Sequence, residues 1–221
     1  MRTLIVNFKN YPEVLGEGSL GLARAVQRVS EEVGIECIVA PPTPMIALVA
    51  SKSKVQVYSQ GVGSKSGDKT TGEVLPEAVK AAGATGTLLN HSESRLTPEE
   101  LKELVPRLKS IGMGFCLCAQ TADEAADLAS LGPKYVAIEP PELIGSGIAV
   151  SKARPELVQK TVAAVRRTGY DGGILCGAGI VSGEDVTRAV GLGADGVLVA
   201  SSVVKASDWE SKIRELARSL S

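Results

Sequence analysis

Eight short apolar runs alternate with eight helical stretches along this chain, and the alternation constrains the fold more than any other feature. The runs are rich in Val, Ile, Leu and Cys, and most are apolar throughout, which is typical of strands buried on both faces of a parallel sheet. The predicted strands are residues 3–6, 36–40, 55–59, 86–89, 114–118, 135–138, 173–176 and 196–199. The predicted helices are residues 19–33, 45–51, 76–82, 98–111, 122–129, 155–168, 183–190 and 209–220.

The helical stretches carry start and stop signals. Thr97 offers an N-cap, Pro98 stands at the first helical position and Glu100 completes a capping box, and the segment 182–185 has a similar pattern. Glycines that can end a helix follow six of the stretches, at Gly34, Gly83, Gly112, Gly132, Gly169 and Gly193.

Strict alternation of strands and helices along a chain gives parallel strands joined by helical crossovers. Eight such units favour closure into a (β/α)8 barrel over an open doubly wound sheet. No linker divides the chain, so one α/β domain is expected over residues 1–221.

Composition excludes several classes of partner. The chain has 24 basic and 25 acidic side chains, with no basic block or stripe, so nucleic acid is not expected as a partner. No run approaches the ~20 apolar residues that a membrane span needs. The apolar start of the chain is too short for a signal peptide, so a cytoplasmic protein without a membrane partner is expected.

The four cysteines and the single histidine limit the metal chemistry that is available. Cys37, Cys116, Cys118 and Cys176 all lie in apolar runs, so buried free thiols in a reducing compartment are expected. The Cys116-x-Cys118 spacing lacks the two-residue gap of zinc and redox motifs, and no second histidine is available as a ligand. No metal is therefore expected.

Three side chains that can carry proton chemistry follow predicted strands. In a (β/α)8 barrel the chemistry is located at the carboxyl ends of the strands, and Lys9, His91 and Glu139 follow the first, fourth and sixth strands. A carboxylate can take a proton beside a carbonyl while a cation and an imidazole stabilise the oxyanion that develops. Each residue alone also has a plain structural explanation, since lysine is usually solvated and a single histidine is ambiguous. Their shared position favours catalysis.

Glycine-rich segments follow the seventh and eighth strands, where barrels often bind phosphate through backbone N–H groups. These segments are Gly177-Ala178-Gly179 and Ala200-Ser201-Ser202. A G-x-G pattern alone is weak evidence for phosphate binding, because glycine also serves tight turns.

The segment 139–147 has the pattern of a lid, with Pro140-Pro141 stiffening one end and Gly145 and Gly147 able to act as hinges at the other. An ordinary loop between strand and helix is the alternative.

A series of short motifs runs in order along the whole chain, and it resembles the pattern of the triosephosphate isomerase family. The motifs are Val6-Asn7-Phe8-Lys9, Thr71-Gly72-Glu73, His91-Ser92-Glu93-Ser94-Arg95, Ile138-Glu139-Pro140, Gly177-Ala178-Gly179-Ile180 and Leu198-Val199-Ala200-Ser201. The resemblance implies the TIM-barrel fold. It also implies cofactor-free interconversion of D-glyceraldehyde 3-phosphate and dihydroxyacetone phosphate through an enediolate, as in glycolysis and gluconeogenesis.

The resemblance also implies roles for individual residues. Glu139 would shuttle the proton, a neutral His91 would polarise the carbonyl and Lys9 would stabilise the enediolate. Asn7 would help to hold the substrate, and Glu93 would support the site. The backbone near Ile144, Gly145, Gly179, Ala200 and Ser201 would bind the phosphate group.

The chain departs from the longer members of this family in three ways. It is shorter, its lid reads Pro-Glu-Leu-Ile where those members carry an aromatic residue, and Gly177-Ala178-Gly179 lacks a substrate-contacting serine that many of them have. The compact form resembles the archaeal branch, which implies a homo-oligomer, with a tetramer favoured and a dimer as the alternative. By analogy, the long loop 61–73 would dock into a neighbouring subunit.

Two other functions compete with this one. A different phosphate-binding barrel, such as an aldolase or a biosynthetic phosphosugar isomerase, is the first. A Schiff-base aldolase needs a lysine inside the rim, whereas the sixth and seventh strands lead into Glu139 and Gly177. A non-catalytic barrel that only binds sugar phosphates is the second, and such a protein should have lost one of Lys9, His91 and Glu139.

Overall fold

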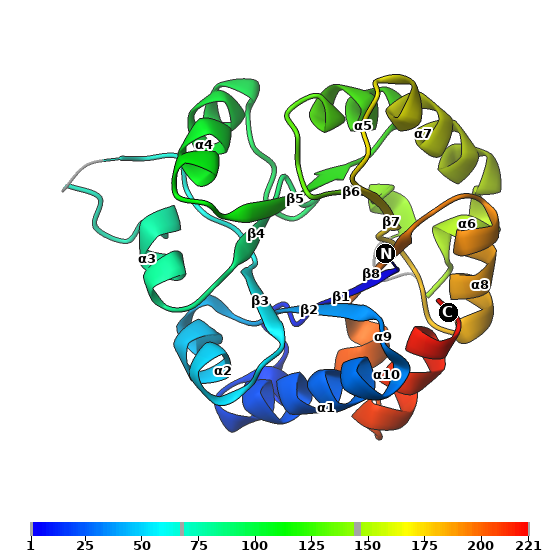
Figure 1. Ribbon diagram of the computed structural model, residues 1–221, viewed down its shortest axis with the longest axis horizontal. Coiled ribbons are helices and arrows are strands. Elements are labelled where there is room, and N and C mark those ends of the chain that lie inside the picture. The colour runs from blue at the N-terminus through cyan, green and yellow to red at the C-terminus, as the bar shows by residue number, and fades with distance from the viewer. Residues whose placement is uncertain (1, 67–68, 144–146, 221) are drawn as a thin grey trace.

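The computed structural model describes residues 2–66, 69–143 and 147–220, and eight parallel strands form a closed barrel at its centre (Figure 1). The strands are β1 (Thr3–Asn7), β2 (Glu36–Ala40), β3 (Gln56–Ser59), β4 (Gly86–Leu89), β5 (Gly114–Ala119), β6 (Tyr135–Ile138), β7 (Gly173–Cys176) and β8 (Gly196–Val199). Each strand pairs with its neighbours in sequence, and β1 also pairs with β8, with Thr3 opposite Gly196. The predicted (β/α)8 architecture is confirmed, and every predicted strand lies within one residue of its observed bounds.

Helices form a ring around this barrel (Figure 1). They are α1 (Glu17–Val33), α2 (Ile46–Lys52), α3 (Pro76–Ala81), α4 (Pro98–Ser110), α5 (Ala122–Ala129), α6 (Val150–Ala153), α7 (Pro155–Arg167), α8 (Gly183–Gly191), α9 (Ser201–Val204) and α10 (Trp209–Arg218). The eight predicted helices are found within two residues at each end. The short helix α9 begins at the serine pair after β8, whereas α6, which precedes α7, was not predicted because four residues give too little periodicity to detect.

The helix boundaries follow the predicted local chemistry. Thr97 accepts a hydrogen bond from the Glu100 N–H, and the Glu100 carboxylate accepts one from the Thr97 N–H, which completes the capping box of α4. Helix α1 ends at Gly34, whose φ of 76° lies in the left-handed region that glycine adopts without strain. These signals fix where each helix begins and ends, and therefore how long each loop at the barrel rim is.

The barrel separates two hydrophobic layers. The inner layer fills the barrel itself with alternate strand side chains: Ile5, Ile38, Ala40, Tyr58, Leu88, Cys116, Cys118, Tyr135, Ala137, Leu175 and Leu198. The outer layer packs the other strand faces against the helices. Large and small residues complement each other inside the barrel, since a Cβ at Gly86 would lie 2.4 Å from the Tyr58 ring. The barrel is therefore a packed core, and ligands can reach only its ends.

The amino-terminal end of the barrel is closed by a polar cluster around Glu36. Its carboxylate accepts hydrogen bonds from Gln56 at 3.0 Å, Thr3 at 3.1 Å and the Tyr135 hydroxyl, and it forms an ion pair with Lys134 at 2.6 Å. Burial opposes ionisation of Glu36, but the contacts with Lys134, Tyr135 and Gln56 together lower its pKa. Because its groups are paired with one another, this end is structural, and the opposite rim is the place to look for chemistry.

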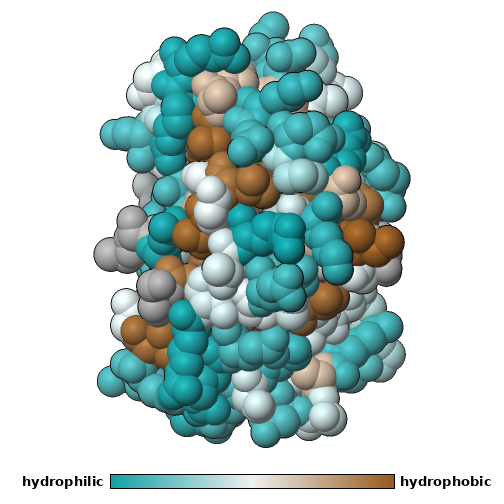
Figure 2. Space-filling view, turned by 90° about the vertical axis from the view of Figure 1, so that its right-hand side faces the viewer, coloured by the Kyte–Doolittle hydropathy of each residue, from teal (hydrophilic) through white to brown (hydrophobic). Residues whose placement is uncertain are grey.

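The surface on the α6 and α8 side is mostly hydrophilic, with hydrophobic residues in small interrupted groups (Figure 2). The exposed large hydrophobic residues include Ile148 and Val181, and both stand near the rim. Within the described part of the chain, no helix has the length and apolar character needed to cross a bilayer.

Candidate active site

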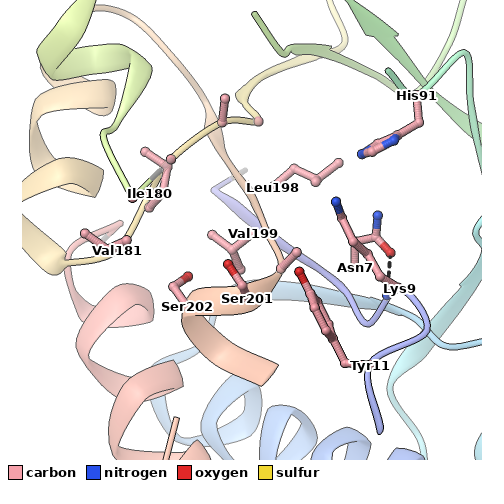
Figure 3. A pocket seen from close by; sticks show the side chains of 15 residues that line it. Asn7, Lys9, Tyr11, His91, Ile180, Val181, Leu198, Val199, Ser201 and Ser202 are labelled. Carbon is pink, nitrogen blue, oxygen red and sulfur yellow. Dashed lines mark hydrogen bonds between the residues drawn. The ribbon is translucent and has the colours of Figure 1, made fainter. Parts of the chain in front are cut away.

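The carboxyl ends of the strands surround a pocket at one rim of the barrel (Figure 3). Strand β1 supplies Asn7 and leads into Lys9, and β4 leads through Asn90 to His91. In Figure 3 these side chains lie across the pocket from the segments that follow β7 and β8. The lining residues are Asn7, Lys9, Tyr11, His91, Gly147, Gly177, Ala178, Gly179, Ile180, Val181, Leu198, Val199, Ala200, Ser201 and Ser202.

Lys9 is held in an uncommon backbone conformation that directs it toward this pocket. Its φ is 47°, in the left-handed region that residues with a Cβ rarely adopt. Two contacts hold this conformation: the Lys9 N–H donates to Asn7 Oδ1 at 2.9 Å, and Gln60 Nε2 donates to the Lys9 carbonyl at 2.7 Å. The Lys9 ammonium forms an ion pair with Glu93 at 2.6 Å. The site thus holds a fixed cation whose carboxylate partner is more than half exposed.

The imidazole of His91 is nearly buried and held as the neutral tautomer with its proton on Nε2. The backbone N–H of Glu93 donates to Nδ1 at 3.1 Å, so Nδ1 must present a lone pair. Burial lowers the pKa of His91, and the nearby Lys9 ammonium lowers it further against the opposing charge of Glu93. The ring therefore offers one N–H donor at Nε2 over the physiological pH range.

Glu139, the first residue after β6, lies beside His91. Its Oε2 atom stands 3.6 Å from His91 Nε2, which is too long for a hydrogen bond. The residue is 1% exposed, and neither carboxylate oxygen makes a hydrogen bond of normal geometry with a described residue. Burial raises the pKa of Glu139 to about 7, against the weaker opposing effects of the Cys118 thiol and the Lys9 ammonium. A carboxyl group with this pKa can exchange protons near neutral pH.

The space that Glu139 occupies depends on a glycine at the end of β7. A Cβ at Gly177 would lie 2.5 Å from Glu139 Cγ and 2.9 Å from Oε1. From the sequence, Gly177 was expected only in a phosphate loop. The adjacency to Glu139 was missed because no local signal shows which strand end faces which.

The other side of the pocket is built from backbone. Gly179 has a φ of 70°, and a Cβ there would lie 1.9 Å from the Ile148 carbonyl oxygen. The Val150 N–H donates to the Ala178 carbonyl at 3.1 Å, which joins the start of α6 to the loop that follows β7. Ala200 and Ser201 line the same side. The lack of side-chain bulk lets a ligand approach the backbone closely.

Most of the predicted site residues meet at this rim. Asn7, Lys9, His91, Gly179, Ala200 and Ser201 line the pocket, Glu139 adjoins His91, and Glu93 contacts Lys9. Ile144 and Gly145 lie outside the described residues. The sequence shows no signal for a role of Gln60 or Asn90 in the site, because the groups that they contact come close only in the folded chain.

Clusters of metal-binding side chains are absent from the part of the chain that the structure describes. No group of three or more His, Cys, Asp or Glu side chains could hold an ion there. The four cysteines are buried as free thiols. The described residues at the rim are suited to proton transfer, with Glu139 as the exchanging group, His91 as a neutral donor and Lys9 as a fixed positive charge.

Comparison with known proteins agrees with this geometry. The family model described as triosephosphate isomerase matches residues 2–216. Proteins named triosephosphate isomerase from Methanosarcina mazei and Methanocaldococcus jannaschii are 46% and 42% identical to the chain over 215 residues, covering 97% of the chain in both cases and 97% and 98% of the relatives. The relative of the same name from Caldivirga maquilingensis is 43% identical over 98% of the chain and 96% of its own length. The chain therefore belongs to the triosephosphate isomerase family.

Proposed function

We propose that the protein interconverts D-glyceraldehyde 3-phosphate and dihydroxyacetone phosphate by proton transfer through an enediolate. The observation that carries this proposal is the pairing of a buried Glu139 carboxyl, which lacks a described hydrogen-bond partner, with the Nε2–H of a neutral His91 at 3.6 Å. A base and a hydrogen-bond donor side by side fit a substrate whose acidic C–H stands next to a carbonyl.

The reaction is a proton shuttle between neighbouring carbons. Glu139 removes a proton from the hydroxyl-bearing carbon beside the carbonyl and returns it to the former carbonyl carbon, while the hydroxyl proton moves from one substrate oxygen to the other. His91 donates from Nε2 to the oxygen that becomes negative, and Lys9 stabilises the same charge. This pairing of a glutamate base with a neutral histidine is the established pattern of the triosephosphate isomerase family. Asn7 holds the lysine loop, and Glu93 supports both His91 and Lys9.

The phosphate group of the substrate is assigned to the backbone side of the pocket. Gly179, Ala200 and Ser201 line that side, and their N–H groups can bind an anion without a basic side chain. Ile144 and Gly145 would add contacts from the lid. Binding the phosphate away from the reacting carbons lets its binding energy orient the substrate for proton transfer.

We further propose that residues 1–221 act as one catalytic domain in the cytoplasm, assembled as a homo-oligomer, with a tetramer favoured. Four buried free thiols are consistent with a reducing compartment. The assembly follows from the resemblance to the archaeal branch, in which the loop 61–73 would dock into a neighbouring subunit. Sedimentation of the purified protein would test the subunit number, and a monomer at all concentrations would contradict the assembly.

The decisive experiment is an assay of the purified protein with the two triose phosphates. We expect conversion in both directions without any added metal or cofactor, and unchanged rates after treatment with a chelator. Glu139→Gln, which removes the base while keeping the shape of the side chain, should abolish turnover. Absence of turnover in the parent protein, or a requirement for a metal, would refute the proposal.

A further inference from the structure

Asn90 has a backbone conformation that few residues adopt. It stands between the end of β4 and His91, it is 2% exposed, and its φ is 59°. Asparagine and aspartate tolerate this left-handed conformation better than other residues that carry a Cβ. The chain direction changes at this point, so the conformation of Asn90 decides the direction in which the next side chain enters the pocket.

The side chain of Asn90 is bonded on both of its polar atoms. Its Nδ2 donates to the Cys118 carbonyl at 3.0 Å and to Glu124 Oε1 at 3.2 Å, while its Oδ1 accepts from the Leu96 N–H at 3.1 Å. Arg95 donates to its backbone carbonyl at 3.2 Å. The residue thus connects the end of β4 to the end of β5, to α5 and to the far end of its own loop.

Glu124, the acceptor on α5, is itself fixed. Its Oε2 accepts from the Gln120 N–H at 2.7 Å, and its own N–H donates to the capping hydroxyl of Thr121 at 3.2 Å. The Arg95 guanidinium forms an ion pair with the same carboxylate. Because its partners are held by β5 and α5, Asn90 is anchored to the rigid part of the barrel.

This anchor lies directly before the turn that sets the state of His91. The Ser94 N–H donates to the His91 carbonyl at 2.8 Å, and the turn so formed directs the Glu93 N–H to His91 Nδ1. A rotation of the backbone at Asn90 would move the ring and weaken the bond that keeps Nδ1 unprotonated. The side-chain amide of Asn90 is already bonded to Cys118, Glu124 and Leu96, so it is not free to bind a substrate and acts through its neighbours.

We propose that Asn90 is a positioning residue that, through its bonds to the ends of β5 and α5, directs the Nε2–H of His91 toward the reacting carbonyl. This inference rests on the proposed function, because it assigns His91 the task of polarising the substrate. The contribution belongs to the transition state, where charge develops on the carbonyl oxygen. The phosphate side of the pocket is separate, so substrate binding should change little.

The variant Asn90→Gly separates the effect of the side-chain hydrogen bonds from the effect of the backbone conformation. Asn90→Gly keeps the left-handed conformation accessible but removes every side-chain hydrogen bond. We expect kcat to fall about 10- to 100-fold, with KM within about threefold of the parent value, because small misplacements of a catalytic group have effects of this size. Val29→Ala, which opens a cavity in α1 far from the rim, is the control for a general loss of stability and should keep kcat within about twofold.

A second readout comes from the fact that His91 is the only histidine. The imidazole nitrogens of a uniformly ¹⁵N-labelled sample therefore give one set of signals that needs no assignment. We expect the parent to show a single neutral tautomer with the proton on Nε2. Asn90→Gly should show a mixture of the two tautomers, whereas Val29→Ala should match the parent. This measurement needs no substrate, so it tests the positioning even if the parent does not turn over triose phosphates.

A charge rearrangement provides a rescue test. Asn90→Asp keeps the backbone conformation and the acceptor for Leu96, but it places a carboxylate against Glu124 and should lower kcat as far as Asn90→Gly does. Adding Glu124→Gln removes the opposing negative charge and supplies a donor to the new carboxylate, whereas the Cys118 carbonyl stays without its donor. The rescue should therefore be partial, with at least threefold of the lost kcat returning. Unchanged kcat and an unchanged tautomer in Asn90→Gly would overturn the proposal, as would a loss that falls on KM alone.

Discussion

At the scale of single residues, Glu139 shows how one side chain connects folding with chemistry. It is fully enclosed, it lacks a hydrogen bond of normal geometry to any described residue, and burial raises its pKa to about 7. Enclosure and the lack of such hydrogen bonds both destabilise the charged form of Glu139 in the folded protein, and the raised pKa is the result. Burial also makes the carboxylate a stronger base toward a substrate carbon, because a carboxylate that is removed from water binds a proton more tightly.

The position of this base can be tested by shortening it. Glu139→Asp retracts the carboxylate by one methylene group, and we expect kcat to fall by roughly 100-fold or more with little change in KM, since misplacement by about 1 Å has an effect of this order. Steady-state kinetics with both substrates would measure it. A kcat equal to that of the parent would exclude Glu139 as the base.

The same residue predicts how stability depends on pH. The folded protein holds the Glu139 proton up to a pH of about 7, whereas the unfolded chain releases it near the ordinary value of 4.5. The native state therefore binds more protons between these values, and Glu139 makes the free energy of unfolding fall as pH rises through this window. The fall should be on the order of 3 kcal/mol and should level off above pH 7.

Urea unfolding of the parent and of Glu139→Gln at several pH values isolates this effect. The amide does not titrate, so the stability of the variant relative to the parent should increase between pH 4.5 and pH 7. Other titrating groups are common to both proteins and cancel in the difference. A difference that does not vary with pH would show that Glu139 has an ordinary pKa in the folded state.

At the scale of elements, β6 and β7 must fit together for the base to be in place. A methyl group at Gly177 overlaps Glu139, so Gly177→Ala should displace the carboxylate and lower kcat by roughly 10-fold or more. Gly191→Ala at the end of α8 is the matched control, because a Cβ there has no neighbour within 4 Å. We expect the control to keep parental kinetics, and equal kinetics in both variants would contradict the predicted overlap.

The elements themselves could be predicted from the sequence, since each depends on local chemistry. The apolar runs located the strands within one residue, and the Thr97 capping box located the start of α4. The contacts between strand ends could not be predicted this way. The approach of Gly177 to Glu139 and the support of Lys9 by Gln60 join residues far apart in sequence, and no local pattern records them.

The candidate site was predictable to a similar extent. Strand ends marked Lys9, His91 and Glu139 as candidates, and the family resemblance suggested their roles. The sequence did not show that the Glu93 N–H binds Nδ1 of His91, or that the two oxygens of Glu139 lack hydrogen-bond partners among the described residues. These features depend on turn geometry and on burial, which exist only after the barrel closes.

At the scale of the whole molecule, closure depends on the pairing of β1 with β8. A Cβ at Gly196 would lie 2.0 Å from the Thr3 carbonyl oxygen, so this glycine lets the two strands meet. Gly196→Ala should lower the free energy of unfolding by on the order of 3 kcal/mol through forced separation of backbone. Equilibrium unfolding would measure the change, with Gly191→Ala as the control. Parental stability in Gly196→Ala would mean that the junction yields without strain.

The junction between β1 and β8 also affects how the chain can be made in a cell. All other strand pairs join consecutive strands, so a growing chain can add them one at a time as they leave the ribosome. The edge of β1 stays unpaired until β8 has been synthesised, and an unpaired strand edge is a template for aggregation. The interval of greatest risk for this protein is therefore set by the speed of translation and ends only when its last strand emerges.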